Sequence, residues 1–268
     1  MKKLESFTSQ HPIATGFLLV VLFSLLSTLT WPIAQLYPYP EGFEVSEAWV
    51  KILMAAFFIA LLWRFGWLKT AGFLNFGENH IWRIVTPLII YKIILSVYIF
   101  SGTSTFGFPN FSINLPLFLA IIFFFLATSL LEESMYRGFL LTAMLKSWGA
   151  TRRGILLSAI VSGVFWGSMH FFNLIVRPFP VVFFQVLYTS LVGFYYAIFT
   201  ISGRSIWPAI VFHWAINASV NLVLNQNPAF EETITLYIWL FVISLLPLLV
   251  SLWMLRPSKR LALAITTS

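Results

Sequence analysis

Long apolar runs separated by short polar segments make up most of the chain. Every run except the fourth has about 17 to 25 residues, the length that a tilted α-helix needs to cross the hydrocarbon core of a bilayer. The pattern predicts an all-α polytopic membrane protein with about eight transmembrane helices around a polar intramembrane cavity. We expect one domain, 1–268, because no segment between the runs is long enough to fold alone. The predicted spans are approximately 13–33, 48–66, 84–100, 115–146, 154–175, 180–201, 205–225 and 234–255.

The fourth run carries ionisable residues inside an apolar setting: Glu132, Glu133 and Arg137. Such groups persist at membrane depth when they pair, face a cavity or take part in chemistry. On a helix, Glu133 and Arg137 are one turn apart and can pair, whereas Glu132 points about 100° away. The glutamates could be structural, but a buried carboxylate is also what a general base requires. Since the run is too long for an upright span, we expect it to be tilted or broken near the two glutamates.

Further polar side chains in later runs reach a similar depth. At a rise of about 1.5 Å per residue, Glu133 and His170 lie roughly 20 and 24 Å from the basic ends of their helices. By the same measure, His213 and Asn217 lie roughly 12 and 18 Å from theirs, and their spacing of four residues places them on one helix face. We therefore predict a site shared by three helices, with Asn221 as a weaker candidate on the same face.

Each of these polar residues also has a structural interpretation. A lone histidine on an apolar helix, such as His170, is usually a satisfied core residue, although Gly163 and Gly167 would allow a neighbouring helix to approach closely. His213 and Asn217 could be interhelical hydrogen-bonding groups, metal ligands, or donors to an oxyanion. The sequence pattern leaves these alternatives open.

Composition and charge agree with a membrane protein. The chain is 59% hydrophobic and 9% charged, whereas about 25% of the residues of a soluble domain are charged. A net charge of +7 would indicate a nucleic-acid partner in a soluble protein, but here the basic residues lie between apolar runs, so we expect none. If the N-terminus is inside, the positive-inside rule is satisfied and both termini are cytoplasmic. The basic residues on the inner side are then Lys2, Lys3, Arg64, Lys69, Arg83, Arg137, Lys146, Arg152, Arg153, Arg204, Arg256, Lys259 and Arg260.

Three short blocks in the middle of the chain resemble the CPBP family of membrane proteases, the CAAX-processing and bacteriocin-processing proteins also called the Abi family. The resemblance covers about 125–222, within a predicted catalytic core of about 115–225. Trp stands where the family has Phe in the second block. The blocks are Glu132-Glu133-x-x-x-Arg137, Trp166-x-x-x-His170 and His213-x-x-x-Asn217.

The resemblance implies an intramembrane endopeptidase in which a glutamate activates water. It makes Glu132 the general base and His170 its partner in positioning the water, while His213 and Asn217 bind the oxyanion. It assigns an architectural role to the adjacent carboxylate and the arginine. The substrate would be a membrane-anchored protein or peptide, either a CAAX-type tail or a peptide leader. The short loops favour a prokaryotic cell membrane.

Metal dependence and two other functions remain open at this stage. Glu132, His170 and His213 form a set that could bind Zn²⁺, although their spacing is not that of the His-Glu-x-x-His proteases. A metal-free mechanism fits the same residues and is slightly favoured. The alternatives are a non-catalytic immunity or scaffold protein, or a proton-coupled transporter. Against a transporter, matching halves with broken helices are not evident in the sequence.

Overall fold

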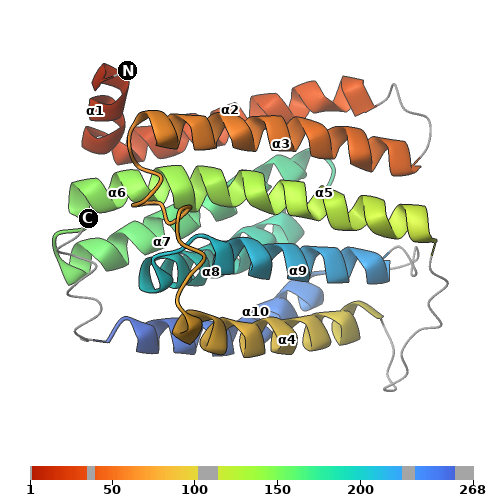
Figure 1. Ribbon diagram of the computed structural model, residues 1–268. Coiled ribbons are helices and arrows are strands. Elements are labelled where there is room, and N and C mark those ends of the chain that lie inside the picture. Colours follow the sequence, from red (N-terminus) through yellow and green to blue (C-terminus); the bar gives the residue numbers. More distant parts are fainter. Residues whose placement is uncertain (1, 35–39, 102–113, 225–232, 257–268) are drawn as a thin grey trace.

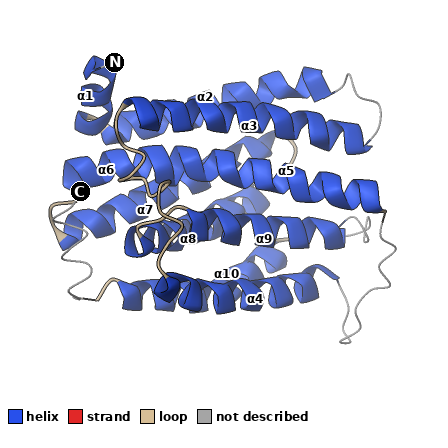
Figure 2. Ribbon diagram, viewed as in Figure 1, coloured by secondary structure: helices blue, strands red, loops and turns tan. Residues whose placement is uncertain are grey.

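The computed structural model describes residues 2–34, 40–101, 114–224 and 233–256 (Figure 1). Within these ranges the chain forms helices and loops, and no strand is present (Figure 2). The prediction of an all-α polytopic membrane protein is confirmed. The helices are α1 (Lys2–Gln10), α2 (Pro12–Ala34), α3 (Pro40–Arg64), α4 (Asn79–Ser101), α5 (Leu115–Glu133), the π-helix η1 (Ser134–Leu140), α6 (Leu141–Trp148), α7 (Arg152–Ser168), the 3₁₀-helix η2 (Met169–Ile175), α8 (Phe179–Gly203), α9 (Trp207–Leu224) and α10 (Ile234–Met254).

Seven segments of the described chain are long and apolar enough to cross a membrane, and they correspond to the second to eighth predicted runs. The first predicted run, 13–33, falls in α2. It makes an eighth span only if α1 and α2, which meet at a bend of 106°, are counted together. The seven segments are Val45–Arg64, Asn79–Ile99, Leu115–Trp148, Arg152–Ile175, Phe179–Gly203, Trp207–Leu224 and Ile234–Met254.

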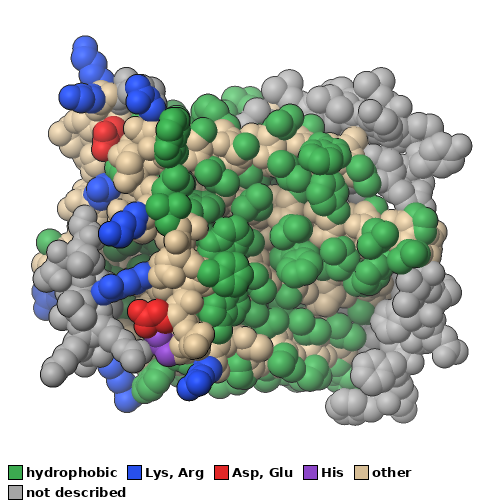
Figure 3. Space-filling model, in the orientation of Figure 1, with side chains coloured by type: hydrophobic (Ala, Val, Ile, Leu, Met, Phe, Trp, Pro, Cys, Tyr) green, Lys and Arg blue, Asp and Glu red, His purple; other side chains and the backbone are tan. Residues whose placement is uncertain are grey.

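The long helices lie side by side along one axis, and α10 ends at the same end of the bundle that carries α1 (Figure 1). On the face shown in Figure 3, Lys and Arg side chains gather at that end, while the rest of the described surface is largely apolar. This is the charge distribution that the positive-inside rule gives for a cytoplasmic end. The cytoplasmic location of both termini stays a prediction.

The fourth run is broken directly after the glutamates, as the sequence predicted. α5 ends at Glu133, the π-helix η1 follows, and α6 continues towards Trp148. All seven residues of η1 are buried. π-helical turns are rare and frequently mark functional sites, and this one changes the helical register between the glutamates and α6.

Capping side chains fix the starts of the helices that carry and support the site. Asn114 accepts a hydrogen bond from the backbone N–H of Leu117 at the start of α5, and Thr151 accepts one from Gly154 at the start of α7. These oxygens satisfy donors that the first turn of a helix leaves without partners.

Small residues bring α7 against α8, as the sequence predicted. A Cβ atom on Gly163 would lie 2.7 Å from both the backbone nitrogen of Phe194 and the backbone oxygen of Ser190. A Cβ atom on Gly167 would meet backbone atoms of Ser190 and Val186 at 2.7 and 2.8 Å. The two backbones therefore approach more closely than any larger residue permits.

We expect Gly163→Val to lower the stability of the protein by about 1–3 kcal/mol or to prevent folding, because the added atoms would force backbone and not only side chains apart. Thermal unfolding in detergent would measure the effect. The matched control is Val164→Ala on the adjacent exposed position, which should change the unfolding temperature little. Equal unfolding temperatures for Gly163→Val and the wild type would contradict the close packing.

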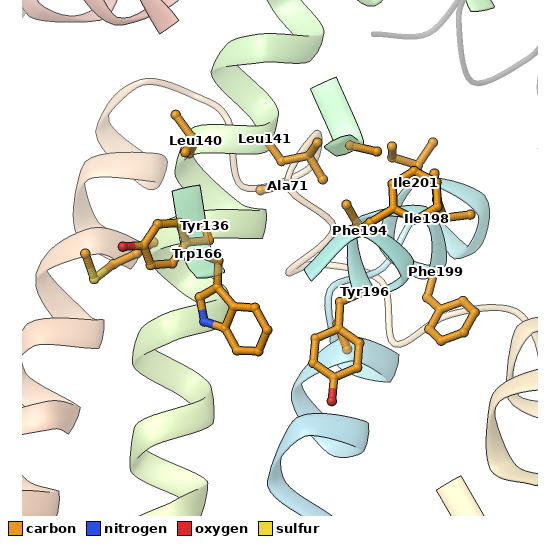
Figure 4. Packing of buried hydrophobic residues seen from close by; sticks show 14 of the residues in the cluster. Ala71, Tyr136, Leu140, Leu141, Trp166, Phe194, Tyr196, Ile198, Phe199 and Ile201 are labelled. Carbon is orange, nitrogen blue, oxygen red and sulfur yellow. The ribbon is translucent and has the colours of Figure 1, made fainter. Parts of the chain in front are cut away.

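The core next to the site is built from η1, α6, α7 and α8 (Figure 4). Leu140 of η1, Leu141 of α6, Trp166 of α7 and Tyr196 and Ile201 of α8 belong to one cluster of buried side chains. These side chains are buried, so they fix the relative positions of the helices that carry the polar residues.

Candidate active site

The two adjacent glutamates have different environments. The Glu133 side chain is fully buried; its Oε2 lies 3.1 Å from Nε of Arg137 and its Oε1 lies 2.9 Å from Nδ1 of His213. The Glu132 side chain keeps 10% of its surface exposed, and its Oε2 accepts a hydrogen bond of 2.7 Å from Nε1 of Trp166. Glu133 is thus held by two partners, while Glu132 keeps a small part of its side chain accessible.

His213 connects the two glutamates from α9. Because an ionised carboxylate accepts hydrogen bonds, the contact with Glu133 places a proton on Nδ1. The other ring nitrogen, Nε2, then faces Glu132, 3.9 Å from its Oε2. The rings of Trp166 and Tyr196 pack against the imidazole at centroid distances of 5.2 and 5.8 Å. The orientation of this histidine is therefore fixed by one carboxylate and two aromatic rings.

Trp166 occupies the centre of the cluster, a role that sequence reasoning missed. Its indole N–H donates to Glu132, and its ring lies 5.9 Å from the ring of His170 and 5.2 Å from that of His213. The guanidinium carbon of Arg137 lies 4.6 Å from the centroid of the same ring. The available signal was that a buried tryptophan needs an acceptor for its N–H, and Glu132 is within the same set of motifs.

Arg137 is completely buried and stacks between two aromatic rings. Besides Nε, which faces Glu133, its Nη2 donates to the backbone oxygen of Gly193 at 3.2 Å. Its guanidinium carbon also lies 5.4 Å from the ring of Tyr196. Nη1 has no hydrogen-bond partner among the described residues. A guanidinium in this position orients Glu133 and leaves one donor unused.

His170 lies at the edge of the cluster, in the part of the predicted span that follows α7. α7 ends at Ser168, and His170 follows in the 3₁₀-helix η2. The imidazole is half-buried; its Nδ1 lies 3.2 Å from the backbone oxygen of Gly167 and donates to it. With Nδ1 as the donor, Nε2 is left as an acceptor. Trp166 contacts both this ring and Glu132.

Asn217 lies one helical turn beyond His213 on α9, as its spacing predicted, and it is half-buried. Its backbone oxygen accepts a hydrogen bond from the side chain of Asn221. In the part of the chain that the structure describes, no hydrogen bond to the Asn217 side chain is present. The amide is thus free to meet a substrate group.

A zinc ion held by Glu132, His170 and His213 is one of the alternatives that the sequence left open. A catalytic zinc ion needs three protein ligands at about 2.0–2.2 Å from the metal. Among the described residues, no group of three His, Asp or Glu side chains is arranged to hold a metal ion. Glu132, His170 and His213 do not form such a group among these residues.

The comparisons with known proteins agree with the motifs. Residues 114–219 match the family described as type II CAAX prenyl endopeptidase, Rce1-like. The matched segment runs from the N-cap of α5 into α9 and contains all three motif blocks. Neither a curated protein nor a solved structure shows significant similarity to the chain. The family resemblance is confirmed over this segment, and it supports a membrane protease.

Proposed function

We propose that this chain is an intramembrane endopeptidase that cleaves a peptide bond in a CAAX-type C-terminal tail, with Glu132 as the general base. The observation that carries the proposal is the division between the two glutamates. Glu133 is buried and engaged by Arg137 and His213, whereas Glu132 keeps part of its side chain accessible. A base must reach both water and substrate. The accessible part of Glu132 supports this role for Glu132 and not for Glu133.

The reaction adds water across the peptide bond. Glu132 takes a proton from water as the oxygen attacks the carbonyl carbon, and the same proton then passes to the nitrogen as the C–N bond breaks. Trp166 fixes the carboxylate through its N–H. Glu133 and Arg137 position the ring of His213 beside the reacting groups.

The carbonyl oxygen becomes negative during attack and needs donors in the protein. The Asn217 amide is the proposed donor on α9, one turn from His213. His170 is proposed to hold the attacking water through Nε2, since its Nδ1 donates to Gly167. These roles follow the family resemblance, and the half-buried state of both side chains is compatible with them.

The proposal places the protein and its substrate in the same bilayer, in a prokaryotic cell membrane with both termini cytoplasmic. The basic end of the bundle then faces the cytosol, where a C-terminal tail anchored by a lipid would be presented. The partner is therefore a lipid-anchored protein or peptide. A peptide leader that enters from the membrane is the other substrate that the motifs allow.

Cleavage of a prenylated peptide by the purified full-length protein tests the function directly. We expect one cut after the prenylated cysteine and release of a tripeptide, both identified by mass spectrometry. Adding a chelator should leave the rate unchanged for the glutamate mechanism, whereas inactivation that Zn²⁺ reverses would establish a metalloprotease. If neither CAAX-type tails nor peptide leaders were cleaved in detergent or in liposomes, the proposal would be overturned.

Trp166→Phe is expected to lower kcat about tenfold with little change in KM, because a hydrogen bond to a charged group contributes about 1.5–3 kcal/mol. The substitution keeps the aromatic ring between His170 and His213, and it restores the residue found in the family's motif. Steady-state kinetics with the peptide above would measure both constants. An increase in KM with kcat unchanged would show that Trp166 contacts substrate and does not position Glu132.

A further inference from the structure

A cavity of about 370 Å³ lies beside the candidate active site, at the end of the bundle where the basic side chains gather (Figure 3). Three of its lining residues are cationic: Lys69, Arg137 and Arg204. None of the described residues that line it is acidic. Its neutral polar lining residues are Thr70, Asn75, Thr142 and Thr200.

Two of the three cations of this cavity, Lys69 and Arg204, pair with no carboxylate within the described chain. Arg137 pairs with Glu133 through Nε, but its Nη1 is buried without a hydrogen-bond partner. A cavity in which positive side chains converge without acids attracts an anion. Hydroxyl and amide groups in the lining can add hydrogen bonds to its oxygens.

Arg204 occupies its position against the preference of the backbone. It follows α8 with φ 48° and ψ 33°, the left-handed conformation, and it is the only described residue other than glycine with a positive φ. Glycine or asparagine is the usual residue at this position after a helix. Retaining arginine in a strained conformation indicates a function for its side chain.

The cavity adjoins the catalytic groups through Arg137, which lines it and also contacts Glu133. Leu141, another lining residue, follows Glu132 by nine positions, which is at most about 13 Å along the helix axis. A peptide of three extended residues spans about 10 Å. A group three residues beyond the cleaved bond therefore falls at the depth of the cavity.

We propose that this cavity binds the α-carboxylate at the C-terminus of the peptide substrate. The inference rests on the proposed endopeptidase function and deepens it, because it explains how the enzyme selects the last peptide segment of a chain over internal segments. Lys69 and Arg204 supply two positive charges. Nη1 of Arg137, which has no partner, supplies a hydrogen-bond donor.

The position of the cavity favours a peptide end over a lipid headgroup. Arg137, Thr142, Ile155 and Thr200 are buried, so the inner wall of the cavity lies inside the bundle and not on its lipid-facing surface. An anionic headgroup would bind at the rim of the cavity, where Lys69 and Arg204 are exposed. Lipid binding is one outcome of the test below.

The experiment compares one prenylated peptide with either a free C-terminal carboxylate or a C-terminal amide. Binding is measured by fluorescence to the full-length Glu132→Gln protein, and cleavage is measured with the wild type. We expect the acid to bind about tenfold more tightly than the amide, the value of one charged hydrogen bond. Lys69→Gln with Arg204→Gln should abolish this preference, whereas the control Arg153→Gln, an exposed arginine of α7 outside the cavity, should retain it.

A second variant separates a binding role from a structural one. Arg204→Gly relieves the left-handed strain, so it should raise the unfolding temperature while it lowers the preference for the acid. Equal binding of acid and amide to the protein that carries only Glu132→Gln would overturn the carboxylate site. If the cavity variants kept the preference for the acid over the amide but no longer bound phosphatidylglycerol vesicles, the cavity would be a lipid site. If the wild type cleaves the peptide but the acid binds no better than the amide, this inference is rejected and the proposed function stands. If the acid binds better but the wild type cleaves neither peptide, the proposed function is rejected and the carboxylate site stands.

Discussion

Glu132→Gln is expected to lower kcat/KM by about 10²- to 10⁴-fold, the contribution of a positioned general base. Glutamine has nearly the same shape, and its side-chain oxygen can still accept the hydrogen bond that Trp166 now donates to Glu132. Folding should therefore be preserved, and the loss should fall on kcat. Cleavage of the prenylated peptide, followed with the unfolding temperature of the same preparation, measures both effects.

The matched control is Glu78→Gln, on an exposed carboxylate whose side chain keeps 62% of its surface accessible. It should cleave as the wild type does. Full activity in Glu132→Gln would reject this residue as the base and with it the mechanism proposed above. A folded but inactive Glu132→Gln together with inactive His170→Ala would support a catalytic protein over a scaffold that merely retains these groups.

Arg137→Met is expected to destabilise the protein by about 3–5 kcal/mol, because it leaves Glu133 buried without its closest cation. Both side chains are fully inaccessible, and Nε lies 3.1 Å from the carboxylate. Combining it with Glu133→Gln removes both charges, so the double variant should recover part of the loss. Thermal unfolding of the three variants in one detergent gives the coupling between the two residues.

A partly exposed pair supplies the comparison. His80 lies 3.0 Å from Glu78, with 28% and 62% of the two side chains accessible, and removing that contact with His80→Gln should cost less than about 1 kcal/mol. If Arg137→Met were no more destabilising than His80→Gln, the buried pair would not hold the site together. If the double variant were less stable than either single variant, the two charges would have separate partners.

Local features of the site could be predicted because they depend on spacing along one helix. The pairing of Glu133 with Arg137 follows from a separation of four residues, and the break after α5 follows from the length of the fourth run. Contacts across helices could not be predicted. Depth along the membrane normal placed His213 near the glutamates, but the rotation of α9 decides that its Nδ1 meets Glu133 and not Glu132.

Two other positions show the same limit. Lys51 lies within α3, where its Nζ donates to Thr128, one turn before Glu132, and the sequence pattern did not indicate this contact. Trp166 entered the sequence argument only as an aromatic residue in a motif. Its hydrogen bond to Glu132 depends on how α7 packs on α5 and η1, where Ser162 of α7 donates to the backbone oxygen of Tyr136.

The ion pair within a single helical segment also has a consequence for biosynthesis. His213, the second partner of Glu133, is 80 residues further along the chain, so the membrane segment with both glutamates is synthesised and inserted before it. During that interval Arg137, already present on the same segment, can neutralise Glu133 and lower the cost of placing it in lipid. The partner of Glu133 that comes from another helix is therefore added only when α9 has been synthesised.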